Sequence, residues 1–153
     1  MMKKIILGVL CILVLVFILG NSLLPPDVSG KFSSAVGEFL ASFLGEGDAN
    51  QTVGGLPVRK IGHFVEFFAF GVVMILLSKV WLKKTYFVYS FVAFIGLLIP
   101  VIDETLQIFS DRGSTLTDVW IDVCGYAVGV VLACTVIFLL KNLKYRVKNN
   151  NKK

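Results

Sequence analysis

The sequence predicts an all-α integral membrane protein, with four transmembrane helices, both termini in the cytoplasm and an amphipathic helix in the first outer loop. The first reason is composition: 56% of the 153 residues are hydrophobic and 16% are charged, and so short a chain cannot bury that much apolar surface in its own core. The second is that long stretches carry no charge, and about 20 residues of helix cross a hydrocarbon layer of about 30 Å. The third is that basic residues concentrate in alternate connections. Within a single domain covering 1–153, we expect helices near residues 5–24, 61–82, 85–106 and 117–140.

The first predicted helix lies in an uncharged stretch that runs from residue 5 to residue 26. Residues 1–4, Met-Met-Lys-Lys, followed by an apolar run are also how a secretory signal peptide begins. The run is too long for a typical signal core, however, and no small-x-small cleavage site follows it. We therefore expect the segment to be retained as a membrane span, which ends at Asn21-Ser22.

The other three helices correspond to uncharged stretches at 67–78, 85–102 and 123–140. The first of these is too short to cross a membrane by itself. It becomes a span when His63, Glu66 and Lys79 are included. The connection to the next helix is then very short, so the second and third helices are expected to form an antiparallel pair.

The basic residues orient the predicted helices. The amino terminus, the second connection and the carboxy-terminal tail carry basic charges and no acidic ones, and basic residues are retained in the cytoplasm. These residues are Lys3, Lys4, Lys79, Lys83, Lys84, Lys141, Lys144, Arg146, Lys148, Lys152 and Lys153. All ten acidic residues fall on the other side, so both termini are expected inside. The tail, 141–153, is interpreted as a solvated anchor touching anionic lipid headgroups, and no nucleic acid is expected as a partner.

The first outer connection contains the predicted amphipathic segment, residues 31–44. Its apolar side chains recur at helical spacing and form one stripe, and a glycine would end the helix. The stripe consists of Phe32, Val36, Phe39, Leu40, Phe43 and Leu44. Such a segment either caps the bundle as a lid or lies in the outer interface of the membrane.

The cysteines give no indication of a metal site. Cys11, Cys124 and Cys134 lie inside apolar segments, and their spacing is not that of metal ligands. The sequence also lacks a His-x-x-x-His pair. We therefore predict packing roles for the cysteines, and we expect no metal and no cofactor.

Polar residues that a membrane span should not contain mark the outer end of the second predicted helix. Arg59, His63 and Glu66 share one stripe of this helix, and Lys60 lies one step round from it. Glu66 lies about 9 Å deeper than Lys60 at about 1.5 Å of rise per residue. A short carboxylate at that depth needs a partner, whereas lysine and arginine reach back to the interface.

The third and fourth predicted helices carry matching groups. In the third, one face at the outer end holds Asp103, Glu104 and Gln107. In the fourth, Asp118 and Asp122 lie one turn apart, and the same line continues through Gly125 and Gly129. Small residues at this spacing let membrane helices approach closely. The line is therefore interpreted as acidic at its outer end and as a packing seam below.

These groups converge on the outer surface, where the first helix also ends. Facing lipid, each carboxylate would cost about 2.5–3.5 kcal/mol on insertion scales, whereas facing one another they share basic counter-charges. We therefore predict one outer pocket that binds a ligand. Its candidate residues are Arg59, Lys60, His63, Glu66, Asp103, Glu104, Gln107, Arg112, Asp118 and Asp122.

Three blocks of these residues resemble the VanZ-like family of small bacterial membrane proteins. The blocks, in chain order, are Lys60-x-x-His63-x-x-Glu66, Asp103-Glu104-x-x-Gln107, and Arg112 followed by Asp118-x-x-x-Asp122-x-x-Gly125. The resemblance covers residues 21–129, with two departures: Asn21-Ser22 stands where a Ser-Ser pair is expected, and Asp122 stands where the family often has asparagine. It implies a multi-pass protein of the Gram-positive cell membrane with a role in low-level resistance to teicoplanin-type glycopeptide antibiotics, and it implies no particular reaction.

Three functions remain open, and the preferred one is binding without catalysis. Its ligand would be a lipoglycopeptide antibiotic or a lipid-linked cell-wall precursor, held at the membrane surface among the surrounding lipids. The second is a membrane enzyme that modifies a lipid or peptidoglycan precursor, with His63, Glu66 and Asp103 supplying acid–base chemistry, or with the histidine and several carboxylates holding a divalent metal; no nucleophile motif supports it. The third is a structural or transport subunit that forms a homo-oligomer along the Gly125/Gly129 seam.

Overall fold

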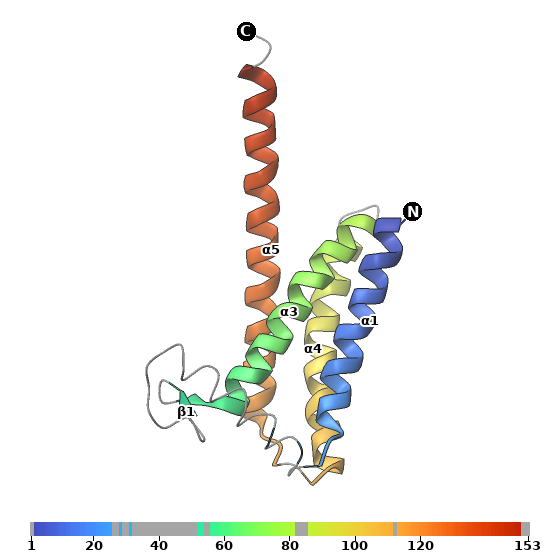
Figure 1. Ribbon diagram of the computed structural model, residues 1–153, viewed down its shortest axis with the longest axis vertical. Coiled ribbons are helices and arrows are strands. Elements are labelled where there is room, and N and C mark those ends of the chain that lie inside the picture. The colour runs from blue at the N-terminus through green and yellow to red at the C-terminus, as the bar shows by residue number, and fades with distance from the viewer. Residues whose placement is uncertain are drawn as a thin grey trace.

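The computed structural model describes residues 2–25, 28, 31, 52–53, 56–81, 86–111 and 113–150. Four long helices and one short hairpin make up this part of the chain (Figure 1). All four helices are long and apolar enough to cross a membrane, which confirms the predicted fold class. Arg112 and the predicted amphipathic segment beyond Lys31 lie outside the described residues.

Each of the four helices coincides with one predicted span. α1 covers Met2–Ser22, α3 covers Val58–Trp81, α4 covers Tyr86–Phe109 and α5 covers Leu116–Asn150. The largest difference is at the end of α5, which continues as helix through most of the predicted basic tail. That stretch contains no glycine or proline to stop a helix, and all of its residues from 138 to 150 are exposed.

A two-stranded hairpin precedes α3. β1 (Thr52–Val53) pairs antiparallel with β2 (Leu56–Pro57), so that Thr52 lies opposite Pro57 and Val53 opposite Leu56. The sequence-based expectation of a purely helical chain omits this hairpin. The Gly-Gly dipeptide between the two short runs is a sequence feature typical of hairpins.

The helices alternate in direction across the bundle (Figure 1). The start of α1, the end of α3 and the start of α4 lie at one end, and α5 extends past this end to the carboxy terminus. The end of α1, the start of α3, the end of α4 and the start of α5 meet at the opposite end, beside the hairpin. Both chain termini therefore lie toward the same side of the bundle, and the assignment of that side to the cytoplasm stays a prediction from the basic residues.

The most extensive helix contact joins α3 and α5, and α3 also packs against α1. Gly125 and Gly129 lie directly on the backbone of α3, where an added Cβ would meet the carbonyl oxygens of Phe64 and Phe68. Glycine allows this approach because it presents no side chain at the crossing. The face on which a homo-oligomer contact was predicted is thus covered by α3 of the same chain.

The buried apolar core lies beside this crossing, where α1, α3 and α5 meet. Ile18, Phe67 and Phe70 are fully buried, and the ring of Phe70 lies 5.4 Å from the ring of Tyr126 between centroids. The hydroxyl of Tyr126 donates a hydrogen bond to the carbonyl oxygen of Val92 at 2.8 Å, which ties α5 to α4. Many large apolar side chains elsewhere on the helices are exposed, as expected for surfaces that face lipid.

Candidate functional site

The polar side chains of the four helices gather at the end of the bundle beside the hairpin. α1 ends there, α3 and α5 begin there, and α4 reaches it with its last turns (Figure 1). We call this group the polar cluster. Its members are Asn21, Ser22, Arg59, Lys60, His63, Glu66, Asp103, Glu104, Gln107, Asp118 and Asp122.

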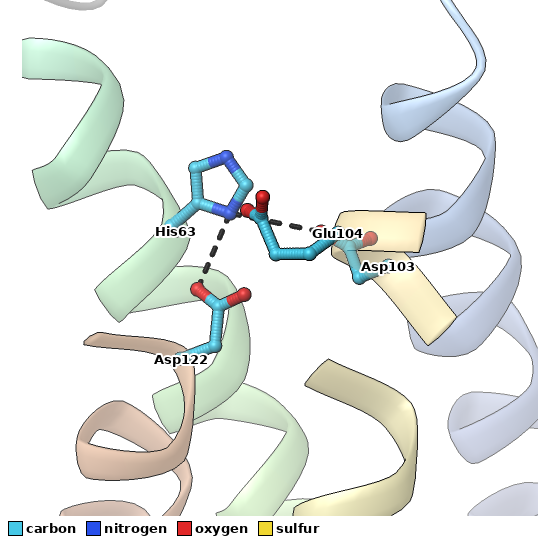
Figure 2. A group of neighbouring side chains, drawn as sticks. All are labelled: His63, Asp103, Glu104 and Asp122. Carbon is cyan, nitrogen blue, oxygen red and sulfur yellow. Dashed lines mark ion pairs between the residues drawn. The ribbon is translucent and has the colours of Figure 1, made fainter. Parts of the chain in front are cut away.

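The centre of the polar cluster is the imidazole of His63, which faces two carboxylates from different helices (Figure 2). Its Nδ1 atom lies 3.2 Å from Oδ1 of Asp122 on α5 and 3.7 Å from Oδ2 of Asp103 on α4. The exposed fractions are 6% for His63, 1% for Asp103 and 0% for Asp122. The helical spacing placed each residue on the correct face, and the packing of three helices brings them into contact.

Asp103 is held by hydrogen bonds on both of its oxygens. The hydroxyl of Ser22 donates to Oδ1, and Nε2 of Gln107 donates to Oδ2 at 2.9 Å. The first bond joins α1 to α4, and Ser110 adds a second connection by donating from its hydroxyl to the carbonyl oxygen of Ser22 at 2.8 Å. The end of α1 is therefore part of the site, because it fixes the orientation of the Asp103 carboxylate.

Glu104 is buried beside the same imidazole, with 3% of its surface exposed (Figure 2). Its Oε2 atom accepts a hydrogen bond from the hydroxyl of Ser114, which lies between α4 and α5. Its Oε1 atom has no hydrogen-bond partner among the described residues. One oxygen of Glu104 is therefore anchored, and the other faces into the polar cluster.

Glu66 lies apart from this centre, on the side of α3 that faces α1. Nδ2 of Asn21 donates a hydrogen bond to its Oε1 atom at 3.1 Å. The same side chain lines a groove of about 320 Å³ between α1 and α3, whose other walls are apolar and include Leu13, Phe17 and Ala69. Glu66 is thus the point at which the polar cluster meets an apolar groove on the membrane-facing surface.

The rim of the polar cluster carries its basic residues. Nζ of Lys60 lies 3.6 Å from Oδ1 of Asp118, and a guanidinium nitrogen of Arg59 lies 3.9 Å from Oδ2. The same nitrogen of Arg59 donates hydrogen bonds to Oε1 of Gln107 and, at 3.0 Å, to the carbonyl oxygen of Gly113. The side chains of Arg59 and Lys60 are 34% and 35% exposed, so they are the accessible part of the site.

Nine of the ten residues predicted from the sequence lie in the polar cluster, and the tenth, Arg112, is outside the described residues. The sequence places Ser22 at this end of the first helix and Ser110 and Ser114 in a predicted turn, and none of the three was included among the candidates. The hydroxyl of Ser22 donates to Asp103 and that of Ser114 donates to Glu104, whereas the hydroxyl of Ser110 donates to the backbone carbonyl of Ser22. These serines lie next to helix ends that carry buried carboxylates, and this position is the sequence signal that predicts their role.

Four side chains of the polar cluster each turn a possible metal ligand toward a common point. The ligand atoms all lie within 4.8 Å of one another, and all four residues are buried (Figure 2). We call them the four-donor group; they are His63, Asp103, Glu104 and Asp122. They come from α3, α4 and α5, so no short sequence motif contains them.

Comparisons with known proteins identify one family. The family model described as VanZ/LLP1 matches residues 7–140, a range that includes every residue of the polar cluster. This match confirms the resemblance seen in the sequence. No curated protein matches the chain, and no solved structure matches it.

Proposed function

The chain belongs to the VanZ/LLP1 family, and from this membership and the geometry of the polar cluster we propose that it lowers susceptibility to teicoplanin-type glycopeptide antibiotics by binding a ligand at the outer surface of a Gram-positive cell membrane. The ligand carries both a polar head and a lipid chain. It is either the lipoglycopeptide itself or a lipid-linked precursor of the cell wall.

The observation that carries this proposal is the position of Glu66 between two unlike surfaces. On one side, its carboxylate is bonded to Asn21 within the polar cluster. On the other side, it lines the groove between α1 and α3, whose walls are otherwise apolar. The lipid chain of a ligand would lie in this apolar groove, in place of membrane lipid, while the polar head of the same ligand lies against the polar cluster. Ligands with both parts fit such a site, whereas purely polar ligands leave the groove unused.

The rim supplies groups for the polar head. Arg59 and Lys60 are accessible, and both are paired with the same carboxylate, that of Asp118. A carboxylate or phosphate of the ligand would compete with Asp118 for these two cations, and charge-assisted hydrogen bonds of this kind are the stronger ones. The buried centre of the cluster then holds the rim residues in place through the bond from Arg59 to Gln107.

A photo-crosslinking experiment in membranes tests this binding. The probes are a teicoplanin-type lipoglycopeptide, a glycopeptide without the lipid chain, and a lipid-linked cell-wall precursor. We expect the lipid-bearing probe that is the ligand to label the wild-type chain, and the double variant Arg59→Ala, Lys60→Ala to reduce labelling by roughly tenfold or more, because each lost charged hydrogen bond is worth about 1.5–3 kcal/mol. Lys79→Ala is the matched control, since Lys79 is an exposed basic residue at the other end of the same helix.

The groove is tested separately with Ala69→Trp, which fills it. This variant is expected to reduce labelling by the lipid-bearing probe and to leave the weak labelling by the chain-free glycopeptide unchanged. Equal labelling of the wild type and the rim double variant by every probe would contradict the proposal. Susceptibility to the antibiotic is scored alongside protein level in each variant.

The alternative of a membrane enzyme has one observation in its favour, the buried contact of His63 with two carboxylates. Such an arrangement suits acid–base chemistry by His63, Glu66 and Asp103 on a lipid or peptidoglycan precursor. The centre of the cluster is nearly closed, however, with exposed fractions between 0% and 6%, so a substrate would have to open it. Release of a new product from the precursor by wild-type vesicles, absent with His63→Ala vesicles, would favour the enzyme.

A further inference from the structure

The four-donor group contains buried atoms that no hydrogen bond satisfies. Both carboxylate oxygens of Asp122 and the Oε1 atom of Glu104 lack a hydrogen-bond partner in the described part of the chain, and so does Nδ1 of His63. Asp122 is 0% exposed and Glu104 is 3% exposed. Buried polar atoms in proteins are nearly always bonded. His63 Nδ1 and Asp122 Oδ1 pair with each other at 3.2 Å, but Asp122 Oδ2 and Glu104 Oε1 have no such partner among the described residues, which favours a ligand between these side chains.

The spacing of these atoms is close to the spacing of ligands around one ion. Nδ1 of His63 lies 3.2 Å from Oδ1 of Asp122 and 3.7 Å from Oδ2 of Asp103, without hydrogen-bond geometry. Two atoms that each bind an ion at about 2.1 Å, at an angle of about 90–110°, are about 3.0–3.4 Å apart. The 3.2 Å distance lies in this range, whereas the 3.7 Å distance and the 4.8 Å extent of the group require the side chains to draw together when an ion binds.

Neighbouring side chains hold the donors in these positions. Asp103 is fixed by the bonds from Ser22 and Gln107, and the bond from Ser114 to Oε2 of Glu104 leaves Oε1 without a hydrogen-bond partner among the described residues. Figure 2 shows this carboxylate beside the ring of His63. Carboxylates that bind metals are usually oriented by hydrogen bonds of this kind from a surrounding shell.

The charge of the group also requires compensation. Three carboxylates lie together in the membrane-spanning part of the protein, where an uncompensated buried charge costs several kcal/mol. The ion pairs of Arg59 and Lys60 go to Asp118 at the rim. Among the described residues, Asp122 pairs with the imidazole of His63 and Glu104 has no ion pair, so a single imidazole faces three carboxylates.

We propose that the four-donor group binds one divalent cation of the zinc or manganese type. One imidazole nitrogen suits zinc and related transition metals, and three carboxylate oxygens suit manganese and other hard cations. The cation would neutralise two of the carboxylate charges and join α3, α4 and α5 at their shared end. Local spacing could not predict this site, because its donors come from three helices and form no His-x-x-x-His pair. The inference goes beyond the proposed ligand binding and does not depend on it.

Metal content of the purified full-length chain tests the proposal. The protein is purified in detergent with its affinity tag removed, is equilibrated with limiting Zn²⁺ or Mn²⁺, and is freed of unbound metal before elemental analysis. We expect about one equivalent per wild-type chain, and an affinity at least roughly tenfold lower in Asp122→Asn and in Glu104→Gln. Asp111→Asn is the matched control, because it makes the same chemical change at an exposed carboxylate outside the polar cluster.

A spectroscopic measurement identifies the ligands independently of affinity. Zinc-edge X-ray absorption of the wild type is expected to show one imidazole, which is lost in His63→Ala. Gel filtration and helical circular dichroism test whether each variant is folded. If Asp122→Asn is unfolded, the comparison with the wild type rests on Glu104→Gln alone. Wild-type protein with less than about 0.1 equivalent of either metal, or equal metal in the wild type and in an Asp122→Asn, Glu104→Gln double variant, would overturn the proposal.

The outcomes of the two sets of experiments are separable. Metal content is measured without antibiotic or precursor, whereas crosslinking follows the rim and the groove. A metal-free chain that still crosslinks to the lipoglycopeptide overturns the cation site and leaves the proposed function standing. A chain that binds the metal and does not crosslink overturns the proposed function and leaves the cation site standing.

Discussion

Replacing Gly125 with alanine is expected to separate α5 from α3 and to disturb the polar cluster at the same time. An added Cβ at this position would lie 2.5 Å from the carbonyl oxygen of Phe64, and 3.1 Å from its Cα atom. These are backbone atoms, which cannot rotate away as the end of a side chain would. Because ordinary contacts begin near 3.4 Å, the two helices must move apart by about 1 Å.

The cost follows from the position of the contact. Overpacking of a closely packed site typically costs about 1–3 kcal/mol, and each 1.4 kcal/mol lowers the ratio of folded to unfolded protein about tenfold. Phe64 follows His63 in α3, and Gly125 lies one turn after Asp122 in α5. The same movement therefore lengthens the 3.2 Å contact between His63 and Asp122.

The assay is unfolding of the purified chain in mixed micelles, followed by helical circular dichroism as the fraction of denaturing detergent rises. Gly62→Ala is the matched control, because Gly62 lies in α3 and an added Cβ there meets nothing within 4 Å. The control is expected to be neutral or stabilising by up to about 1 kcal/mol, since alanine favours helix over glycine. A Gly125→Ala chain as stable as wild type, or two variants that lose equal stability, would refute the reasoning.

Three further predictions concern the contacts that join the helices and the side of the membrane on which they end. Ser22→Ala removes the hydroxyl that bonds to Asp103 and is expected to cost about 1–3 kcal/mol, because a buried carboxylate loses one of its hydrogen bonds; unfolding in the same micelles measures it, and a wild-type midpoint would contradict it. Tyr126→Phe removes the bond to Val92 and is expected to cost about 0.5–1.5 kcal/mol in the same assay, with the ring contacts retained; no loss would show that this bond does not hold α5 to α4. In a cysteine-free background, Lys148→Cys is expected to react with a membrane-impermeant maleimide after the cells are opened and not before, because the basic tail is predicted to be cytoplasmic; labelling of intact cells would contradict this orientation.

Much of the fold was predictable because a membrane imposes strong rules on a short chain. Long uncharged stretches have few alternatives to spanning helices when every backbone group must be bonded within the chain. The four predicted spans accordingly coincide with α1, α3, α4 and α5. The hairpin before α3 and the helical continuation of the tail were not predicted, because both lie where the apolar pattern stops.

The composition of the polar cluster was also predictable, because polar side chains in apolar helices are costly unless they meet. Helical spacing alone put His63 and Glu66 on one stripe of α3. The structure separates their surroundings: His63 faces α4 and α5, whereas Glu66 faces α1 and the apolar groove. A helix 10–12 Å across presents residues of one stripe to different neighbours when other helices cross it at an angle.

The sequence by itself thus determined the membrane class, the approximate spans, the family and the residues that gather at one end, because these depend on apolar length, on the helical repeat and on motifs along a single chain. The tertiary structure decided which atoms meet. It placed the hydroxyl of Ser22 on Asp103, covered the glycine seam with α3 and brought donors from three helices to within 4.8 Å of one another. The contacts of α5 depend on how closely it approaches α3, and glycines on both helices, Gly71, Gly125 and Gly129, allow that approach because an added Cβ at any of them would meet the backbone of the other helix.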